Sequence, residues 1–337
     1  MAVLTGVVGC GRNDQTGPSL TTLVGVSALA CSPDGKLLAV AHGEPLGASV
    51  WDLTTKNAIH APVPGRFDKL VFSSDSKHVY GIASISNIAI WDAKTGIILH
   101  EHPLPEFKKN GGIALARLIE LCADGKSAYA VHDDFQLLKI DLNGSVTRMP
   151  TEDKSFGCSA YSPALDILVT RGNKWNELEL IKPGEKGPGI NLTMQDARPN
   201  TRLDVKALAF SADGKTLAIS MSPSIHKEEQ KDRCDRVEFW DTKEWKVRCR
   251  IPKTDSPDFR SYESNEMAIS PDGKYLAGRP FGSMVVQIWD IAAQKVVQTK
   301  PFNDLTSCMA FTPDSKTLML GLCNSGIQFV EMSATDK

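Results

Sequence analysis

Short apolar stretches alternate with tight polar turns along most of the chain. Val205–Phe210 alternates small and large apolar side chains before one such turn, and Thr216–Ile219 continues the apolar pattern after it. A period of two is typical of β-strands, and stretches this short are bounded by turn residues rather than by helix caps. The pattern therefore predicts an all-β protein of many short strands joined by hairpins.

One turn sequence recurs with its aspartate and lysine in fixed positions. Pro, Asp and Gly suit tight hairpin turns because Pro presets φ, Asp hydrogen-bonds the nearby backbone and Gly tolerates positive φ. A degenerate further copy, Tyr161–Asp166, lacks the glycine. The six clear copies are Ser32–Lys36, Ser73–Lys77, Cys122–Lys126, Ser211–Lys215, Ser270–Lys274 and Thr312–Lys316.

A Trp-Asp dipeptide, or a similar pair of an apolar and an acidic residue, follows each turn at a nearly constant distance. In the fifth unit this distance is longer, and the fourth unit has only the alternating strand Glu177–Ile181 in its place. Successive turns lie 40 to 59 residues apart. A period of this length with four short strands per unit is the signature of a β-propeller. These pairs are Trp51-Asp52, Trp91-Asp92, Ile140-Asp141, Trp240-Asp241, Trp289-Asp290 and Val330-Glu331.

These turns and dipeptides resemble the WD-repeat (WD40) β-propeller family over roughly residues 19–332. The resemblance implies an all-β, single seven-bladed propeller of four-stranded antiparallel blades. No unit has the family's Gly-His dipeptide. The chain therefore looks like the divergent bacterial branch, and we do not expect the buried Asp-His-Ser/Thr-Trp hydrogen-bond network of eukaryotic members.

The two chain ends favour closure of the ring. Only five residues follow Met332, too few for a fourth strand, whereas residues 19–25 precede the first unit and belong to no unit of their own. We expect residues 19–25 to form the outer strand of the last blade. Residues 1–18 are then a tether or a residual lipoprotein-type signal, and residues 19–337 form the propeller, with blades near 26–63, 67–104, 112–150, 156–196, 204–252, 265–302 and 306–332 plus 19–25.

Charge and hydropathy exclude some classes of partner and leave the location open. Lys and Arg number 38 against 40 Asp and Glu, so general binding to nucleic acid lacks its electrostatic driver. No apolar stretch approaches the length of a transmembrane helix. Val7–Cys10 resembles a lipobox that would place a lipid anchor on Cys10, but Met1–Gly9 has no positive charge and only a short apolar run. A cytoplasmic protein and an envelope lipoprotein both remain possible.

The chain has eight cysteines and no C-x-x-C pair, which disfavours a zinc ribbon or a disulfide scaffold. Cys234 and Cys249 are able to face one another across a hairpin and form a bond. Four other cysteines fall in strand-like apolar segments, where we expect them to pack as small hydrophobic side chains: Cys31, Cys122, Cys158 and Cys308.

The extra residues of the chain concentrate in three connections. In WD-repeat propellers the loops that join the second strand of a blade to the third, and the last strand to the next blade, share one face, which we call the loop face. The recurring Asp-Gly turns lie on the opposite, turn face. Met221–Arg236, Asn191–Leu203 and Thr254–Asn265 all belong to the loop face, over blades four to six. Surface loops on a rigid scaffold commonly carry binding.

Basic and aromatic residues, which dominate protein–protein contacts, occur in this sector. Each of these segments also has an interpretation without a binding role. Trp175 would then pack over a strand end, and Ile225–Arg236, whose charges alternate in sign, would be a solvated hairpin or flap. The candidate contacts with a partner are Arg171, Lys174, Trp175, His226, Lys227, Lys231, Arg233, Phe259, Arg260 and Tyr262. The W-D tryptophans Trp51, Trp91, Trp240 and Trp289 are expected to be structural.

Catalytic motifs are scarce. The sequence has no G-x-S-x-G elbow and no H-E-x-x-H pair. Three loop-face histidines, His42, His132 and His226, are candidate ligands for a metal hydrolase or lactonase site at the mouth of the channel. Small apolar side chains in the channel would argue against that site, and His100 and His102 offer at most an adventitious metal contact.

The sequence as a whole favours a non-catalytic platform that binds a protein or peptide on the loop face, mainly through blades four to six. We expect it to need no cofactor and no metal and to be monomeric by itself. The alternative is the propeller hydrolase or lactonase.

Overall fold

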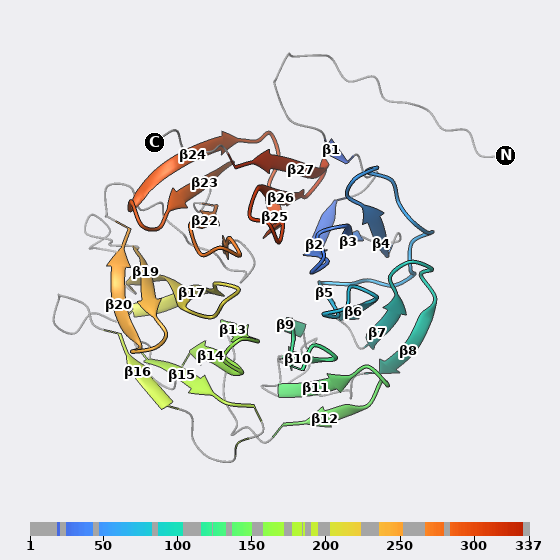
Figure 1. Cartoon of the computed structure of the whole chain (residues 1–337), viewed down its shortest axis with the longest axis horizontal. Helices are drawn as coiled ribbons and strands as arrows, with labels where there is room; N and C mark the ends of the chain where they lie inside the picture. The colour runs from blue at the N-terminus through green and yellow to red at the C-terminus, as the bar shows by residue number, and fades with distance from the viewer. Residues whose placement is uncertain are drawn as a thin grey trace.

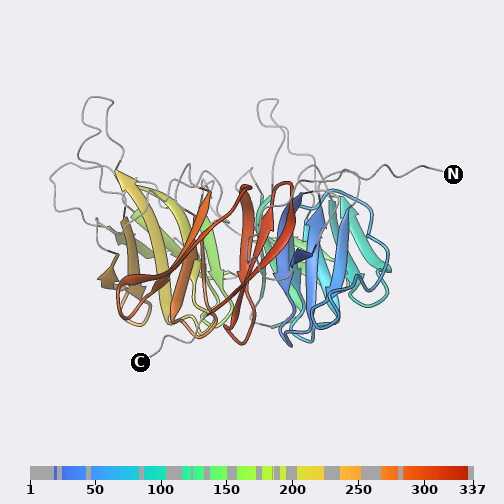
Figure 2. The same ribbon diagram turned by 90° about the horizontal axis from the view of Figure 1, so that it is seen from above.

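The computed structural model is a ring of small β-sheets around a central axis (Figure 1), and it appears edge-on as a flat disc (Figure 2). No helix occurs in the part of the chain that the structure describes, so none of the described elements is a helix able to cross a membrane. The described residues are 19–20, 25–42, 47–82, 87–103, 116–122, 124–132, 137–149, 158–171, 177–183, 185, 190–194, 203–223, 236–251, 267–279 and 284–332.

The described strands form seven antiparallel sheets, each a blade of the ring. The innermost strands of the blades are β2 (Val26–Cys31), β5 (Lys69–Phe72), β9 (Ala116–Leu121), β13 (Ser159–Ser162), β17 (Leu203–Phe210), β21 (Met267–Ile269) and β25 (Thr306–Phe311). The second strands are β3 (Leu37–His42), β6 (His78–Ile82), β10 (Ser127–His132), β14 (Ile167–Arg171), β18 (Thr216–Pro223), β22 (Tyr275–Gly278) and β26 (Thr317–Leu322).

The third and outer strands complete the blades, and the W-D dipeptides end third strands as expected. The third strands are β4 (Ala48–Asp52), β7 (Asn87–Asp92), β11 (Leu137–Asp141), β15 (Glu177–Ile181), β19 (Arg236–Asp241), β23 (Val285–Asp290) and β27 (Gly326–Glu331). The outer strands are β8 (Ile98–Pro103), β12 (Val146–Arg148), β16 (Ile190–Thr193), β20 (Lys246–Arg250), β24 (Lys295–Pro301) and, for the last blade, β1 (Ser19–Leu20).

The ring is closed by joining the two ends of the chain in one blade. Ser19 pairs with Gln328 and Leu20 with Ile327, so β1 is the outer strand of the sheet β1-β27-β26-β25. This confirms the predicted closing strand, although the strand is described only over Ser19–Leu20 within the predicted 19–25. Closure removes a free sheet edge and ties the first residues of the propeller to the last.

The first blade departs from the expected four strands. It contains β2, β3 and β4, and its outer position is filled by a segment attached through two isolated bridges, Ala48 to Val63 and Trp51 to Ala58. Between those bridges lies Pro62, which has no backbone N–H to donate and so interrupts a strand. The outer position of the first blade is therefore occupied as predicted, but by an irregular segment rather than by a regular strand.

The recurring turn has a local structural cause. Ser32 Oγ donates to Asp34 Oδ1 at 2.6 Å, and the same carboxylate oxygen accepts the Lys36 backbone N–H at 3.1 Å. Gly35 takes the left-handed φ of +71° that closes the turn, and where the second blade has no glycine, Ser76 takes a φ of +61°. The Ser32 hydrogen bond holds the pKa of Asp34 below its usual value. The conspicuous repeated aspartates are thus committed to the turns.

Apolar side chains fill the junction between each pair of neighbouring blades. The described residues form seven buried clusters, one for each junction of the ring. The last cluster joins Leu38 and Val40 of the first blade to Met319 and Ile327 of the seventh. The hydrophobic stabilisation is therefore distributed around the ring and depends on closure.

The described cysteines are free thiols. Burial raises the pKa of Cys31, Cys122 and Cys308 to about 12, which fits the predicted role as small packing side chains. Cys249 is a free thiol as well and its Sγ lies 3.8 Å from the Ile291 carbonyl oxygen, so the alternative of a bond from Cys249 to Cys234 is wrong.

Candidate functional site

The turn face is an interlocked belt of backbone turns. Turns of three blades hydrogen-bond to the turn of the next blade: the Asp34 N–H donates to Ser76 Oγ at 3.2 Å, the Asp272 N–H to Ser315 Oγ at 3.0 Å, and the Ser74 N–H to the Gly125 carbonyl oxygen at 3.1 Å. Polar groups engaged in this way hold neighbouring blades in register. They leave the loop face and the central channel as the places where function is to be sought.

The fifth blade extends toward the loop face. In the first, third and seventh blades, a single residue pair lies beyond the bulge that interrupts pairing of the two innermost strands. In the fifth blade three pairs lie beyond it, joining Leu203–Val205 to Met221–Pro223. Two additional pairs lengthen the hairpin by about 7 Å. The yellow strand of this hairpin ends on the upper side of the disc in Figure 2.

The same register locates the long connections. β18 ends at Pro223, β19 begins at Arg236 opposite Met221, and β17 begins at Leu203 opposite Pro223, so these ends share one face. The expected insertion Met221–Arg236 is shorter than predicted, because Met221–Pro223 continue β18. Likewise the connection expected over Asn191–Leu203 begins later, since β16 extends to Thr193.

Of the ten predicted partner contacts, Arg171 alone belongs to the described residues. Arg171 ends β14, where it pairs with Leu178 of β15, and its backbone N–H donates to the Cys158 carbonyl oxygen at 3.3 Å. It therefore sits at a strand end next to the predicted loop. The predicted contacts that lie outside the described residues are Lys174, Trp175, His226, Lys227, Lys231, Arg233, Phe259, Arg260 and Tyr262, and Cys10 lies outside them too.

The W-D tryptophans lie between neighbouring blades. Trp91 and Trp289 are fully buried, and the Trp91 ring lies 5.2 Å from that of Phe67 between the first two blades. Trp240 packs between blades four and five. Trp51, which is partly exposed, packs between blades one and seven.

A short hydrogen-bond chain occupies the first blade, where none was expected. Trp51 Nε1 donates to Ser49 Oγ at 2.7 Å, and Ser49 Oγ lies 2.6 Å from His42 Nε2. This chain differs from the Asp-His-Ser/Thr-Trp network of eukaryotic WD-repeat proteins, because His42 reaches the serine from the end of the second strand and its other ring nitrogen has no hydrogen-bond partner among the described residues. His42 is buried, and burial lowers its pKa.

A buried carboxylate plays the corresponding part in the fifth blade. Glu238 is 1% exposed, accepts the Trp240 indole N–H at 3.0 Å, and accepts Arg250 Nε at 2.7 Å. Sequence reasoning missed this pair. The available signal was an acidic residue between Val237 and Phe239 in a strand buried on both faces.

Of the three histidines proposed as metal ligands, the structure describes the side chain of His42 alone. His42 is engaged with Ser49, the side chain of His132 is outside the described part, and so is His226. Among the described residues, no three His, Cys, Asp or Glu side chains are placed to hold a metal ion. The rings of His100 and His102 stack at 6.4 Å on the outer strand β8.

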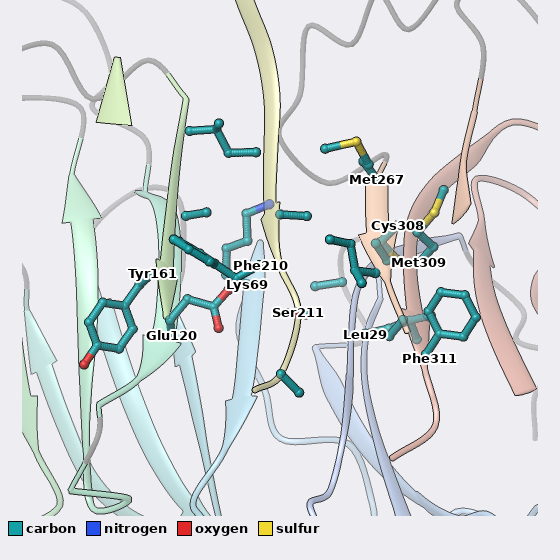
Figure 3. A pocket seen from close by; sticks show the side chains of 18 of the residues that line it. Leu29, Lys69, Glu120, Tyr161, Phe210, Ser211, Met267, Cys308, Met309 and Phe311 are labelled. Atoms are coloured by element: carbon teal, nitrogen blue, oxygen red, sulfur yellow. The ribbon is translucent and has the colours of Figure 1, made fainter. Parts of the chain in front are cut away.

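The central channel is a cavity of about 380 Å³ lined by the innermost strands of all seven blades. Most of the residues that line it have apolar side chains, including Leu29, Leu208, Met267 and Met309, although polar atoms contribute more than half of its exposed surface. Two charged side chains interrupt it. Lys69 of β5 and Glu120 of β9, in adjacent blades, both line the channel (Figure 3), and Lys69 acts electrostatically on Glu120.

The Glu120 carboxylate has an unusual environment. It is partly buried, and none of the described residues donates a hydrogen bond to it. Burial raises the pKa of Glu120 to about 7, against the opposing effect of Lys69. Sequence reasoning did not single out either residue, because each is one polar side chain within a strand and only the closed ring brings them together.

The comparisons with known proteins concern the fold. No protein-family model matches the sequence, and no curated protein matches it. A solved structure of hydrazine synthase from Kuenenia stuttgartiensis is similar with a TM-score of 0.70 and 18% sequence identity, covering 97% of this chain and 100% of the compared chain. At this identity the likeness establishes architecture alone. The chain is a seven-bladed β-propeller built from sequence repeats.

Proposed function

We propose that this protein is a divergent WD-repeat propeller that acts as a non-catalytic platform, binding a protein or peptide on its loop face. Blades four to six supply most of the contact. The observation that carries this proposal is the lengthened hairpin of the fifth blade, which extends β17 and β18 beside the connection from Pro223 to Arg236.

The mechanics of the ring support this role. The strands of each blade are hydrogen-bonded to one another, and each blade packs against its two neighbours. The strand ends that carry the loops are therefore held in place before a partner binds. A preorganised surface loses less conformational entropy on binding than a flexible one. Arg171 lies at such a strand end in blade four, and arginine is a frequent hot-spot residue.

The scarcity of ionisable side chains in the described channel lining supports the platform over the hydrolase or lactonase alternative. Such enzymes need convergent acids, bases or metal ligands, whereas the described lining offers one lysine and one glutamate. Location is a separate matter. Lipidation at Cys10 would place the platform on the cell envelope and stays a prediction, as does the monomeric state.

The loop of blade five provides the direct test. Residues 224–235, which separate β18 from β19, are replaced by a short Gly-Ser turn that leaves both strands intact. We expect a partner captured stoichiometrically by the unmodified protein to be reduced at least about tenfold with this variant, because the contact surface is removed. The measurement is affinity capture from lysate of the source organism, quantified by mass spectrometry.

A turn-face variant serves as the matched control. Lys215 and Lys316 have side chains 83% and 78% exposed on that face, and replacing both with alanine should leave capture unchanged. Equal melting temperatures of the variants exclude misfolding as the cause. Full capture by the loop variant would contradict the proposed face, and the absence of a stoichiometric partner with either protein would favour the enzyme alternative.

A further inference from the structure

The central channel has the size of a small-molecule site, and most of the side chains that line it are apolar. Its volume of about 380 Å³ falls within the range of ligand pockets, which are mostly apolar with a few convergent polar groups. Each of the seven innermost strands contributes to its wall, so the wall is held by the whole ring. A cavity of this kind does not require the loops of the loop face.

The polar groups of the described lining are few, and most are already engaged. The Tyr161 hydroxyl donates to Asp166 Oδ1 at 2.6 Å. Burial raises the pKa of the Cys308 thiol to about 12, so it stays neutral. The Ser211 hydroxyl donates to Asp213 Oδ1 at 2.7 Å. Lys69 and Glu120 are therefore the two groups of this lining that carry or exchange charge near neutral pH.

The charge of the pair sets the ligand class. The Lys69 ammonium has three N–H donors, so it is able to bind a further acceptor in addition to the interaction that it already makes. When Glu120 is protonated, it offers an O–H donor beside that ammonium, and the two groups carry a net positive charge. Such an arrangement attracts an anionic acceptor and repels a cation.

We propose that the central channel binds a small aliphatic monocarboxylate, with its carboxylate held between Lys69 and Glu120 and its hydrocarbon body against the apolar wall. Leu29, Met267 and Met309 belong to that wall. The carboxylate of such a ligand is able to accept hydrogen bonds from one lysine and one carboxylic acid. Its hydrocarbon chain is more stable against apolar side chains than in water. This site is separate from the proposed loop-face platform and does not depend on it.

Octanoate is the probe, and its binding is measured by isothermal titration calorimetry near pH 6 and near pH 8. Octanoate stays ionised over this range, whereas Glu120 loses its proton as the pH rises through its pKa of about 7. A site that prefers protonated Glu120 binds about tenfold more weakly near pH 8 than near pH 6. We also expect proton uptake on binding near pH 8, seen as a binding enthalpy that changes with the buffer.

Two variants separate the roles of the pair. Glu120→Gln keeps a hydrogen-bond donor but no longer titrates, so octanoate should bind with little dependence on pH. Lys69→Met removes the ammonium, and binding should fall at least about tenfold, whereas Lys316→Met on the turn face should bind normally. Melting temperatures of all three variants check that each is folded.

Octylamine is the opposing probe, because it has the same hydrocarbon body with a cationic head. Binding of octylamine in preference to octanoate would overturn the proposal. Three other results would overturn it as well. Octanoate binding would strengthen toward pH 8, or it would be unchanged in folded Lys69→Met, or it would be absent at millimolar concentration with the unmodified protein.

Discussion

Replacing Trp91 with alanine is expected to lower the free energy of unfolding by about 3–5 kcal/mol. The indole is fully buried between the first two blades and contacts Phe67 and the backbone at Gly81 so closely that a methyl group added there would lie 2.8 Å from the ring. Its removal leaves a cavity that a closed ring cannot easily collapse. Urea denaturation followed by far-ultraviolet circular dichroism measures the change.

The neighbouring turn supplies a control for this substitution. Lys94 follows Trp91 in the exposed turn after β7, and Lys94→Ala should change stability by no more than about 0.5 kcal/mol. Trp91→Phe should fall between the two, since it restores part of the lost volume. A loss below about 1 kcal/mol for Trp91→Ala would show that the tryptophans are not the interblade supports described above.

A chain truncated to begin at Val26 is expected to be destabilised throughout, not only in its last blade. Without β1, the backbone groups of β27 that pair with Ser19 and Leu20 lose their partners, and the sheet edge opens beside the junction of blades seven and one. The lost backbone hydrogen bonds alone amount to about 2 kcal/mol. Thermal melting, followed by circular dichroism, should therefore show a lower midpoint.

A chain truncated to begin at Ser19 is the matched control for the closing strand. It keeps β1 and lacks only the residues before it, so its melting temperature should equal that of the full chain. If both truncated chains have the melting temperature of the full chain, the closing strand does not stabilise the ring. The claim that a closed ring holds the loop face in place would then be wrong.

Much of the fold was predictable because it is encoded locally and repeated. The Ser32–Lys36 turn contains within itself the serine, the aspartate and the left-handed glycine that close it, so its six copies predict six hairpins. The W-D dipeptide marks the end of a third strand for a comparable local reason. Interruption of the outer strand in blade one also has a local cause, Pro62, whose effect depends on which strand it falls in.

The candidate sites were less predictable, because they depend on contacts between distant parts of the chain. Lys69 comes near enough to act electrostatically on Glu120 only when blades two and three pack side by side around the axis. Glu238 accepts Arg250 across the pairing of β19 and β20, and the lengthened hairpin of blade five depends on the register of β17 with β18. No period or motif in one segment contains such information.

The protein is proposed to have two separate binding sites, one on the loop face and one in the central channel. The loops of blades four to six are proposed to meet a macromolecular partner, while the cavity on the axis is proposed to hold a small acid. Both rest on the same property, a ring whose inner strands and strand ends are fixed by packing on either side. The two proposals are independent, since each has a variant that leaves the other site intact.

Lysine footprinting of the captured complex tests the central claim most directly, because lysines mark both faces of the ring. Lys227 and Lys231 belong to the loop of blade five, whereas Lys36, Lys215, Lys274 and Lys316 belong to turns of the opposite face. The account predicts that the partner protects Lys227 and Lys231 from an amine-reactive label and leaves the turn lysines labelled as in the free protein. Protection of the turn lysines with full labelling of Lys227 and Lys231 would contradict it.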